Sequence, residues 1–144
     1  MNRAIPTTRD AYRHFINVPT RWMDNDAYGH VNNVVYYSYF DTAVTKFLMD
    51  LELLGPQGSA LIGLVVSTQC QYFAPLSFPD EVVVGLAVAT IGNSSVTYHL
   101  AAFKIYGSTA VAQGQFIHVY VDEESRLPVK LPPDFRQKLT PSIR

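Results

Sequence analysis

The sequence predicts an α+β fold in which one long helix packs against a five-stranded antiparallel sheet. Two observations carry this prediction: a single segment with apolar residues at helical spacing, and five runs rich in β-branched and aromatic residues around it. With 144 residues, the chain has room for one domain with a substantial core. We therefore treat residues 1–144 as a single domain, with its core at about residues 14–122 and a C-terminal tail over residues 123–144.

The helix is expected to begin near Val34 and to run for roughly five turns, to a stop at Gly55-Pro56. Asn32 or Asn33 can cap its start. The apolar positions follow helical spacing at Tyr36, Tyr37, Phe40, Val44, Phe47, Leu48 and Leu51. The other face carries Ser38, Asp41, Thr45, Lys46 and Asp50.

One short strand is expected before the helix and four long strands after it. The predicted strands are His14–Thr20, Leu61–Phe73, Glu81–Ile91, Ser95–Tyr106 and Thr109–Val121. The short connections at Gly92-Asn93 and Gly107-Ser108 are typical of antiparallel hairpins. The tail contains a short helical stretch, DFRQKL, which we expect to pack on the surface of the body.

The distribution of charge predicts a homo-oligomer. Charged residues make up only 16% of the chain, against about 25% in ordinary globular domains. Between Leu53 and Phe103 the only formally charged residues are Asp80 and Glu81. Because an exposed sheet face normally carries polar residues, we expect this sheet to be covered by the helix on one side and by another subunit on the other.

Composition also excludes several classes of protein. A net charge of −1 without any basic run argues against nucleic acid as the main partner. The single cysteine, Cys70, rules out an internal disulfide and fits a reducing compartment. The N-terminus lacks the apolar region of a secretory signal, and glycines, prolines and glutamines interrupt the uncharged stretch Leu53–Pro79. We therefore expect a soluble cytoplasmic protein with no membrane partner.

A polar turn, Asp24–Asn33, directly precedes the helix and is the most informative part of the chain. It contains two aspartates, a glycine, a histidine and two asparagines. A carboxylate held there lies beside the unpaired N–H groups and the partial positive charge of the helix N-terminus. Such a site can polarise an acyl oxygen while the carboxylate attacks the carbonyl carbon or activates water.

Three interpretations of this turn compete. The pattern D-x-D-x-x-G also begins an EF-hand loop, but Val35 stands where that loop requires a bidentate glutamate, so no metal site is expected. A purely structural turn is the second interpretation, and it fits Asp24, whose oxygens are expected to accept local N–H bonds. The third interpretation is a catalytic carboxylate at Asp26.

The turn and the elements behind it resemble a known family. Asp24, Asp26 and Gly29, followed by Tyr36 at the opening of a long helix, resemble the motif of the hotdog-fold acyl-CoA thioesterases, particularly the 4-hydroxybenzoyl-CoA thioesterase type. The variant G-H-V-N-N at Gly29–Asn33 is similar to that of related bacterial thioesterases and of plant acyl carrier protein thioesterases. The resemblance covers roughly residues 15–130.

The resemblance implies a hotdog fold and hydrolysis of acyl-CoA to a carboxylic acid and free CoA. It assigns Asp26 as the catalytic carboxylate, acting as nucleophile or as general base. The backbone N–H at Asn33, with Val34 adjacent, would polarise the thioester carbonyl, and Gly29 would allow the tight turn. His30 is a further candidate because it lies within the turn. CoA is then part of the substrate, with no separate cofactor.

The resemblance further implies active sites at a dimer interface, so that strands of a second subunit complete each pocket. By rough position Ser67, Thr68 and Ser77 are candidates for substrate binding, and Tyr36 for lining an acyl pocket. Some relatives bind the nucleotide phosphates with basic residues near the turn that here contains Asn93, which leaves the CoA anchor unassigned. Dimer or tetramer, aryl or aliphatic acyl group, and CoA or acyl carrier protein all remain open.

Two rival functions stay in view. A hotdog-fold hydratase or dehydratase would place a histidine and a carboxylate on the helix, whereas this helix has Asp41 but no histidine. A non-catalytic acyl-thioester sensor would keep the pocket without needing Asp26. The isolated histidines His14, His99 and His118 are interpreted as packed or surface residues.

Overall fold

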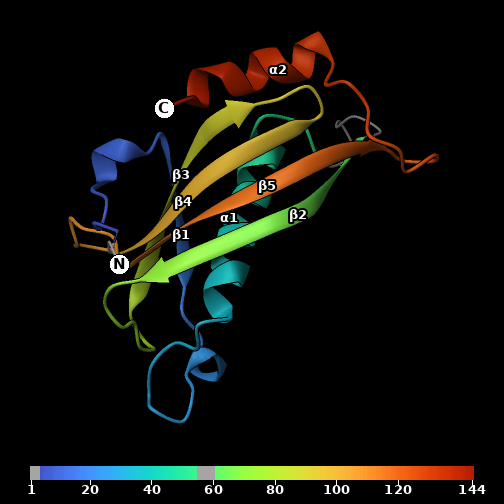
Figure 1. Ribbon diagram of the computed structural model, residues 1–144. Helices are drawn as coiled ribbons and strands as arrows, with labels where there is room; N and C mark the ends of the chain where they lie inside the picture. The colour runs from blue at the N-terminus through green and yellow to red at the C-terminus, as the bar shows by residue number, and fades with distance from the viewer. Residues whose placement is uncertain (1–3, 55–60) are drawn as a thin grey trace.

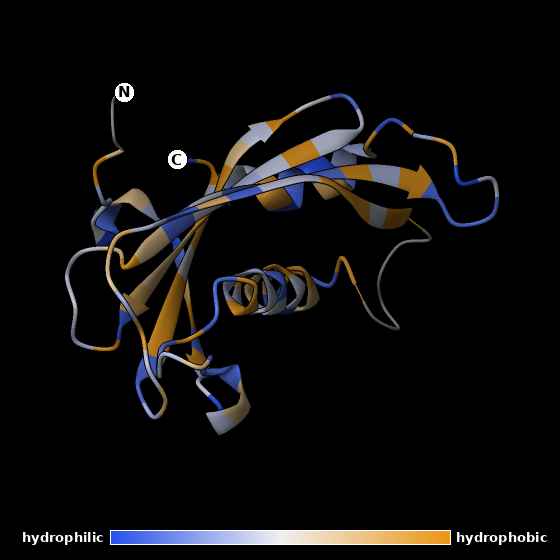
Figure 2. Cartoon of the chain, turned by 60° about the horizontal axis from the view of Figure 1, so that its bottom comes forward, coloured by the Kyte–Doolittle hydropathy of each residue, from blue (hydrophilic) through white to orange (hydrophobic). Residues whose placement is uncertain are grey.

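The computed structural model of the chain describes residues 4–54 and 61–144 and confirms the hotdog fold, in which an antiparallel sheet curves around one long helix (Figures 1 and 2). The long helix is α1, Val35–Asp50. The strands are β1 (His14–Pro19), β2 (Leu61–Tyr72), β3 (Glu81–Ile91), β4 (Ser95–Lys104) and β5 (Ala112–Asp122). A second helix, α2 (Pro133–Leu139), and three short 3-10 turns at Arg9–Ala11, Trp22–Asp24 and Thr140–Ser142 complete the described elements.

The strands follow the spatial order β1-β3-β4-β5-β2. The two predicted hairpins, β3–β4 and β4–β5, are confirmed. The edge strands are β1 and β2, and the chain returns from β2 across the sheet to place β3 beside β1. Strand β2 pairs with β5, and among the described strands none pairs with its other edge from Leu64 onward. That edge strand exposes Leu64, Val65 and Val66, next to a register shift between Val65 and Ser67.

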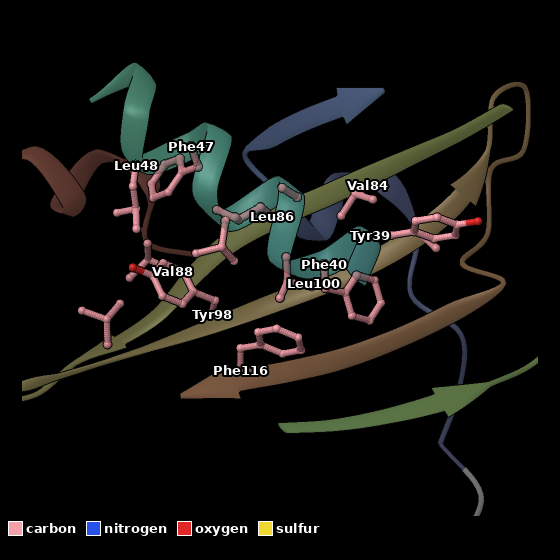
Figure 3. Packing of buried hydrophobic residues seen from close by; sticks show 14 of the residues in the cluster. Tyr39, Phe40, Phe47, Leu48, Val84, Leu86, Val88, Tyr98, Leu100 and Phe116 are labelled. Atoms are coloured by element: carbon pink, nitrogen blue, oxygen red, sulfur yellow. The ribbon is translucent and has the colours of Figure 1, made fainter. Parts of the chain in front are cut away.

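The core lies between α1 and the concave face of the sheet (Figure 3). Phe40 is fully buried and meets Phe116 of β5 edge-to-face, with ring centroids 6.0 Å apart. One end of the helix is anchored similarly, where Phe47 meets Tyr98 of β4 at 6.3 Å. Each such side chain contributes about 1.5–3 kcal/mol when fully buried. These contacts fix α1 along the sheet and thereby place its N-terminus.

Helix α1 ends at Asp50, before the Gly55-Pro56 stop expected from the sequence, which lies outside the described residues. Glu52 adopts a φ of 59°, and the two bonds of a Schellman motif close the last turn: Glu52 N–H to Met49 O (3.0 Å) and Leu53 N–H to Leu48 O (2.9 Å). Leu48 and Leu53 are both buried in the core. The hydrophobic contact of the motif therefore ends the helix without a glycine.

The connection between β4 and β5 is longer than predicted, because its backbone pairs with the N-terminal segment instead of extending the two strands. Ala110 N–H donates to Thr7 O at 2.9 Å. The guanidinium of Arg9 donates to the carbonyls of Lys104, Ile105 and Gly107. Strands β4 and β5 are therefore shorter at this turn than the predicted strands Ser95–Tyr106 and Thr109–Val121. Arg9 bonds to the carbonyls that these strands leave unpaired there.

Part of the convex face of the sheet is covered by the chain's own N-terminal segment, where we had expected another subunit. Tyr12 lies over Gly85, whose absent Cβ would stand 2.9 Å from the tyrosine ring. Tyr12 also packs edge-to-face on Phe103 with centroids 5.9 Å apart. The small residues Ala87 and Ala101 complete this second cluster. Tyr12 can cover this area because small side chains let it approach the sheet closely.

The C-terminal tail packs on the body as expected, although its apolar residues are buried rather than superficial. Phe135 and Leu139 of α2 are buried, and the Phe135 ring lies 4.8 Å from that of Tyr120. Arg136 Nη1 donates to the carbonyl of Gly92 at 2.7 Å, which ties α2 to the β3–β4 hairpin. The tail thus closes one end of the core.

Candidate active site

Asp24 organises the polar turn from inside the protein, as its structural interpretation predicted. It is 1% exposed and accepts hydrogen bonds from Arg21 N–H at 2.9 Å and from Tyr39 Oη at 2.7 Å. Arg21 also forms an ion pair with it at 2.9 Å. Burial raises the pKa of Asp24, but the bonds from Tyr39 and Arg21 outweigh it and hold the pKa below its usual range. Asp24 is therefore an ionised anchor between the turn and α1.

Asp26 lies at the open side of the same turn, half-buried. Its backbone N–H donates to His30 O at 2.8 Å, and its carbonyl accepts the N–H of Gly29 at 3.1 Å. One carboxylate oxygen, Oδ1, accepts the N–H groups of Tyr28 (2.8 Å) and His30 (3.4 Å). Because both of these bonds fall on Oδ1, the second oxygen has no partner among the described residues and is available to a substrate or a water molecule.

Gly29 is needed for the conformation of this turn. Its φ is +78°, in the left-handed region that favours glycine, and a Cβ there would meet nothing within 4 Å. Glycine is therefore required here for its backbone conformation, and not because a side chain would lack space. The Gly29 carbonyl accepts a 2.7 Å bond from Ser77 Oγ, so Ser77 is used within the chain to hold the turn.

The amide of Asn33, just before α1, has no partner within the part of the chain that the structure describes. Asn32 Oδ1 accepts the N–H of Val34 at 3.2 Å in the turn before α1, so the Val34 amide is already bonded. Val34 flanks the helix and its side chain makes no capping bond, so neither predicted asparagine is the N-cap residue of α1. In the described part of the chain no acceptor is assigned to the N–H of Asn33. The carbonyl of Asn33 accepts a 3.0 Å bond from Tyr72 Oη, which links this residue to the end of β2.

Asp26 and Asn33 line one cavity of about 390 Å³ at the helix N-terminus. Its walls come from the turn, the start of α1 and the end of β2, and comprise Asp26, His30, Val31, Asn33, Tyr36, Tyr72, Phe73, Ala74 and Pro75. Burial raises the pKa of Tyr36 to about 12, so its phenol stays protonated at neutral pH. The cavity therefore combines an apolar wall with a carboxylate and a free amide.

Not every residue predicted for the site lies in this cavity. Asp26, Asn33, His30 and Tyr36 line it, while Gly29 and Ser77 hold the turn beside it. Val34 is 62% exposed and does not line it. Ser67 and Thr68 are exposed on β2, outside the cavity formed by a single chain.

Two contributors were missed from the sequence: Tyr72, which bonds to the Asn33 carbonyl, and Tyr39, which bonds to Asp24. Both belong to apolar patterns that predict packing, and no local signal marks their hydroxyl groups. Within residues 4–54 and 61–144, no group of three histidine, cysteine or acidic side chains is placed to hold a metal ion. No helix in the same residues is long and apolar enough to cross a membrane.

Comparison with known proteins agrees with the fold described above. The chain is similar to the PA5185 protein of Pseudomonas aeruginosa, with 48% identity, 96% of this chain and 97% of that chain covered, and a TM-score of 0.91. An acyl-acyl carrier protein thioesterase of Arabidopsis thaliana, ATL3, is 24% identical over 91% of this chain and 70% of its own length. The 1,4-dihydroxy-2-naphthoyl-CoA thioesterase Slr0204 of Synechocystis shares the fold at a TM-score of 0.77, with 18% identity and coverages of 88% and 94%.

The family description "Thioesterase-like superfamily" matches residues 18–139, which include the polar turn, α1 and all of β2 to β5. This family match supports thioester hydrolysis as the general activity. By fold and by sequence, the chain belongs to the thioesterase-like superfamily.

Proposed function

We propose that this protein hydrolyses acyl-CoA thioesters, releasing a carboxylic acid and free CoA. The observation that supports the proposal is the single cavity lined by both Asp26 and Asn33, of which Asn33 has a backbone N–H with no acceptor among the described residues. Hydrolysis of a thioester needs an oxygen nucleophile and a donor for the developing oxyanion. One turn and one helix terminus supply both groups.

In the mechanism that we propose, the thioester carbonyl oxygen accepts the Asn33 N–H. Asp26 takes a proton from a water molecule as the water oxygen bonds to the carbonyl carbon, and the resulting oxyanion is stabilised by that N–H and by the positive end of α1. The C–S bond then breaks, and the CoA sulfur receives the proton from Asp26. Direct attack by the carboxylate, followed by hydrolysis of the anhydride, uses the same residue in nearly the same position.

The proposed active form is a homo-oligomer, at least a dimer. No described strand pairs with the edge of β2 at the exposed Leu64, Val65 and Val66, which favours pairing with a second copy there. Ser67 and Thr68 lie on this strand, so a role for them in substrate binding requires the second subunit. CoA is a part of the substrate, and no separate cofactor is proposed.

Free-thiol release from a panel of aryl-, short-chain and medium-chain acyl-CoAs tests the proposal, with Asp26→Asn as the key variant. Loss of the anionic oxygen should lower kcat by at least about 10²-fold. Asp50→Asn is the matched control, because Asp50 is exposed at the far end of α1 and pairs with Lys46. Full activity in Asp26→Asn would overturn the assignment, and binding without turnover in the wild type would indicate a sensor.

The role of the Asn33 amide is tested separately with a pair of substitutions. Asn33→Ala keeps the backbone N–H, whereas Asn33→Pro removes it. We expect the alanine variant to stay active and the proline variant to lose about 10²–10³-fold in kcat, the usual effect of one lost oxyanion donor. Thermal melting of both variants separates this loss from unfolding.

A further inference from the structure

A second cavity, of about 200 Å³, lies between α1, β2 and β5 and shares no residue with the cavity of the candidate active site. Asp41, eight residues after Asn33, is at its rim, which places it about 12 Å further along the helix axis. Its lining is otherwise mainly apolar and includes Val44, Leu48 and Leu53. The proposed hydrolysis assigns no role to this space.

His118 of β5 makes this cavity unusual. Its side chain lines the cavity, the residue is only 5% exposed, and neither ring nitrogen has a hydrogen-bond partner among the described residues. The neighbouring hydroxyls of Tyr98 and Tyr120 bond to each other at 3.0 Å, and neither forms a hydrogen bond with the His118 ring. Buried polar side chains in native proteins are nearly always hydrogen-bonded, so an unpartnered imidazole facing a cavity indicates a missing partner.

Gly63 of β2 keeps the space beside the imidazole open. A Cβ at this position would stand 3.1 Å from His118 Nδ1 and 2.9 Å from Tyr120 Cε1. Both distances are shorter than ordinary van der Waals contact, so any larger residue would press on the ring. The backbone of β2 therefore approaches His118 closely, and both ring nitrogens have almost no accessible surface as the ring stands. A ligand in the cavity therefore bonds to the imidazole only when the ring turns towards it.

The chemistry of the cavity defines the ligand it fits. Burial lowers the pKa of His118 while the Asp41 carboxylate opposes this, so the ring is neutral at pH 7 and offers one donor and one acceptor. The carboxylate at the rim disfavours an anionic ligand. An engineered apolar cavity of about 150 Å³ holds benzene, so the volume here suffices for one aromatic ring or a short aliphatic group.

We propose that this cavity is a second binding site, for an uncharged apolar group of about the size of phenol whose single hydroxyl hydrogen-bonds to His118. The hydroxyl donates to the unprotonated ring nitrogen, and the ring of the ligand packs against Leu48 and Val44. Two sources offer the same chemistry: a free phenol or alcohol, and the hydroxylated far end of an acyl group bound at Asp26.

Titration with phenol, followed through the side-chain NMR resonances of His118, tests the site without relying on enzymatic activity. Phenol should shift these resonances and bind about three- to tenfold more tightly than toluene, as expected for one net hydrogen bond. His118→Phe should remove the preference for phenol while retaining toluene. The matched control is His99→Gln on the exposed face of β4, which should bind as the wild type does.

Thr45→Leu provides a second variant if His118→Phe does not fold, because Thr45 lines the cavity from α1 and a larger apolar side chain there fills it. It should abolish binding of both probes. Unshifted His118 resonances, or a phenol preference that survives in His118→Phe, would overturn the proposal.

Turnover of matched acyl-CoAs with and without a terminal hydroxyl distinguishes the two sources. If the ligand is the end of the acyl group, His118→Phe lowers kcat/KM only for the hydroxylated substrate. If it is a free molecule, phenol binds without competing with acyl-CoA. Because the phenol titration does not depend on turnover, failure of the proposed hydrolysis and failure of this site give different results.

Discussion

Tyr39 donates a 2.7 Å hydrogen bond to Oδ2 of Asp24 and thereby joins the long helix to the polar turn that holds Asp26. Both residues are buried, and the carboxylate is ionised. The Asp24 backbone carbonyl also accepts the N–H of Asn32 at 2.9 Å, which connects the anchor to the start of α1. The position of the candidate catalytic carboxylate therefore depends on a neighbouring aspartate that does no chemistry itself.

Tyr39→Phe tests this dependence. Removing a hydrogen bond to a buried charged group should lower the free energy of unfolding by about 1.5–3 kcal/mol. Urea unfolding measures the loss, and Tyr106→Phe at a 95% exposed position should leave stability unchanged. An equally stable Tyr39→Phe protein would show that the bond contributes little to holding the turn.

Substitutions at Gly29 test the backbone of the turn. Gly29→Ala should cost about 1–2 kcal/mol, because an L-residue there must adopt a left-handed conformation although no neighbour obstructs its Cβ. Gly29→Asn should cost less, since asparagine tolerates that region better than other L-residues. Urea unfolding ranks the three proteins, and equal losses for alanine and asparagine would contradict the conformational explanation.

Replacement of Glu52 should stabilise the protein. Glu52 occupies the left-handed position of the Schellman motif with a φ of 59°, where glycine is preferred. Glu52→Gly should therefore raise the free energy of unfolding by about 0.5–1 kcal/mol, whereas Asp50→Gly, inside α1, should lower it by a similar amount. A melting temperature that falls in Glu52→Gly would refute the assignment of the motif.

Stability should depend on pH through His118. Burial lowers the pKa of this residue below 6.5, its value in the unfolded chain, so the unfolded state binds the proton more readily. The stability that the protein owes to a neutral His118 ring is therefore fully present above about pH 6.5 and is lost as the pH falls below that value. Burial also lowers the pKa of His14, so His118→Phe should reduce the slope of unfolding free energy against pH without abolishing it.

The same pH series on His118→Phe provides the control. Removing an unpartnered buried imidazole should leave the variant at least as stable as the wild type at pH 5.5, where the wild type carries the cost of protonation. An unchanged slope would mean that His118 is not buried as a neutral ring in solution.

Much of the local structure was predictable because it depends on neighbouring residues. The spacing of apolar residues identified α1, the Gly92-Asn93 and Gly107-Ser108 connections identified two hairpins, and the pattern D-x-D-x-x-G identified the turn. Asn32 or Asn33 was predicted to cap the helix, but Val34 is the N-cap residue, and Asn32 bonds to its N–H within the preceding turn. The end of the helix was harder to predict, because the left-handed residue that follows α1 is Glu52 and not a glycine.

The site could be predicted only in part. Asp26, His30, Asn33 and Tyr36 line one cavity because they are close in sequence. Tyr72 reaches it from β2 through strand pairing that no local pattern encodes. A role of Ser77 in substrate binding stays a prediction, while the structure shows its hydroxyl bonded to the Gly29 carbonyl beside the turn.

The sequence by itself determined the types of element, their order and the chemistry gathered before α1, because periodicity, capping and turn formation act over a few residues. Only the tertiary structure decided that β2 lies at the far edge of the sheet, that Tyr12 covers Gly85, and that His118 faces a cavity without a partner. Those features depend on which distant strands pair and how closely they approach, which is decided by packing across the whole fold.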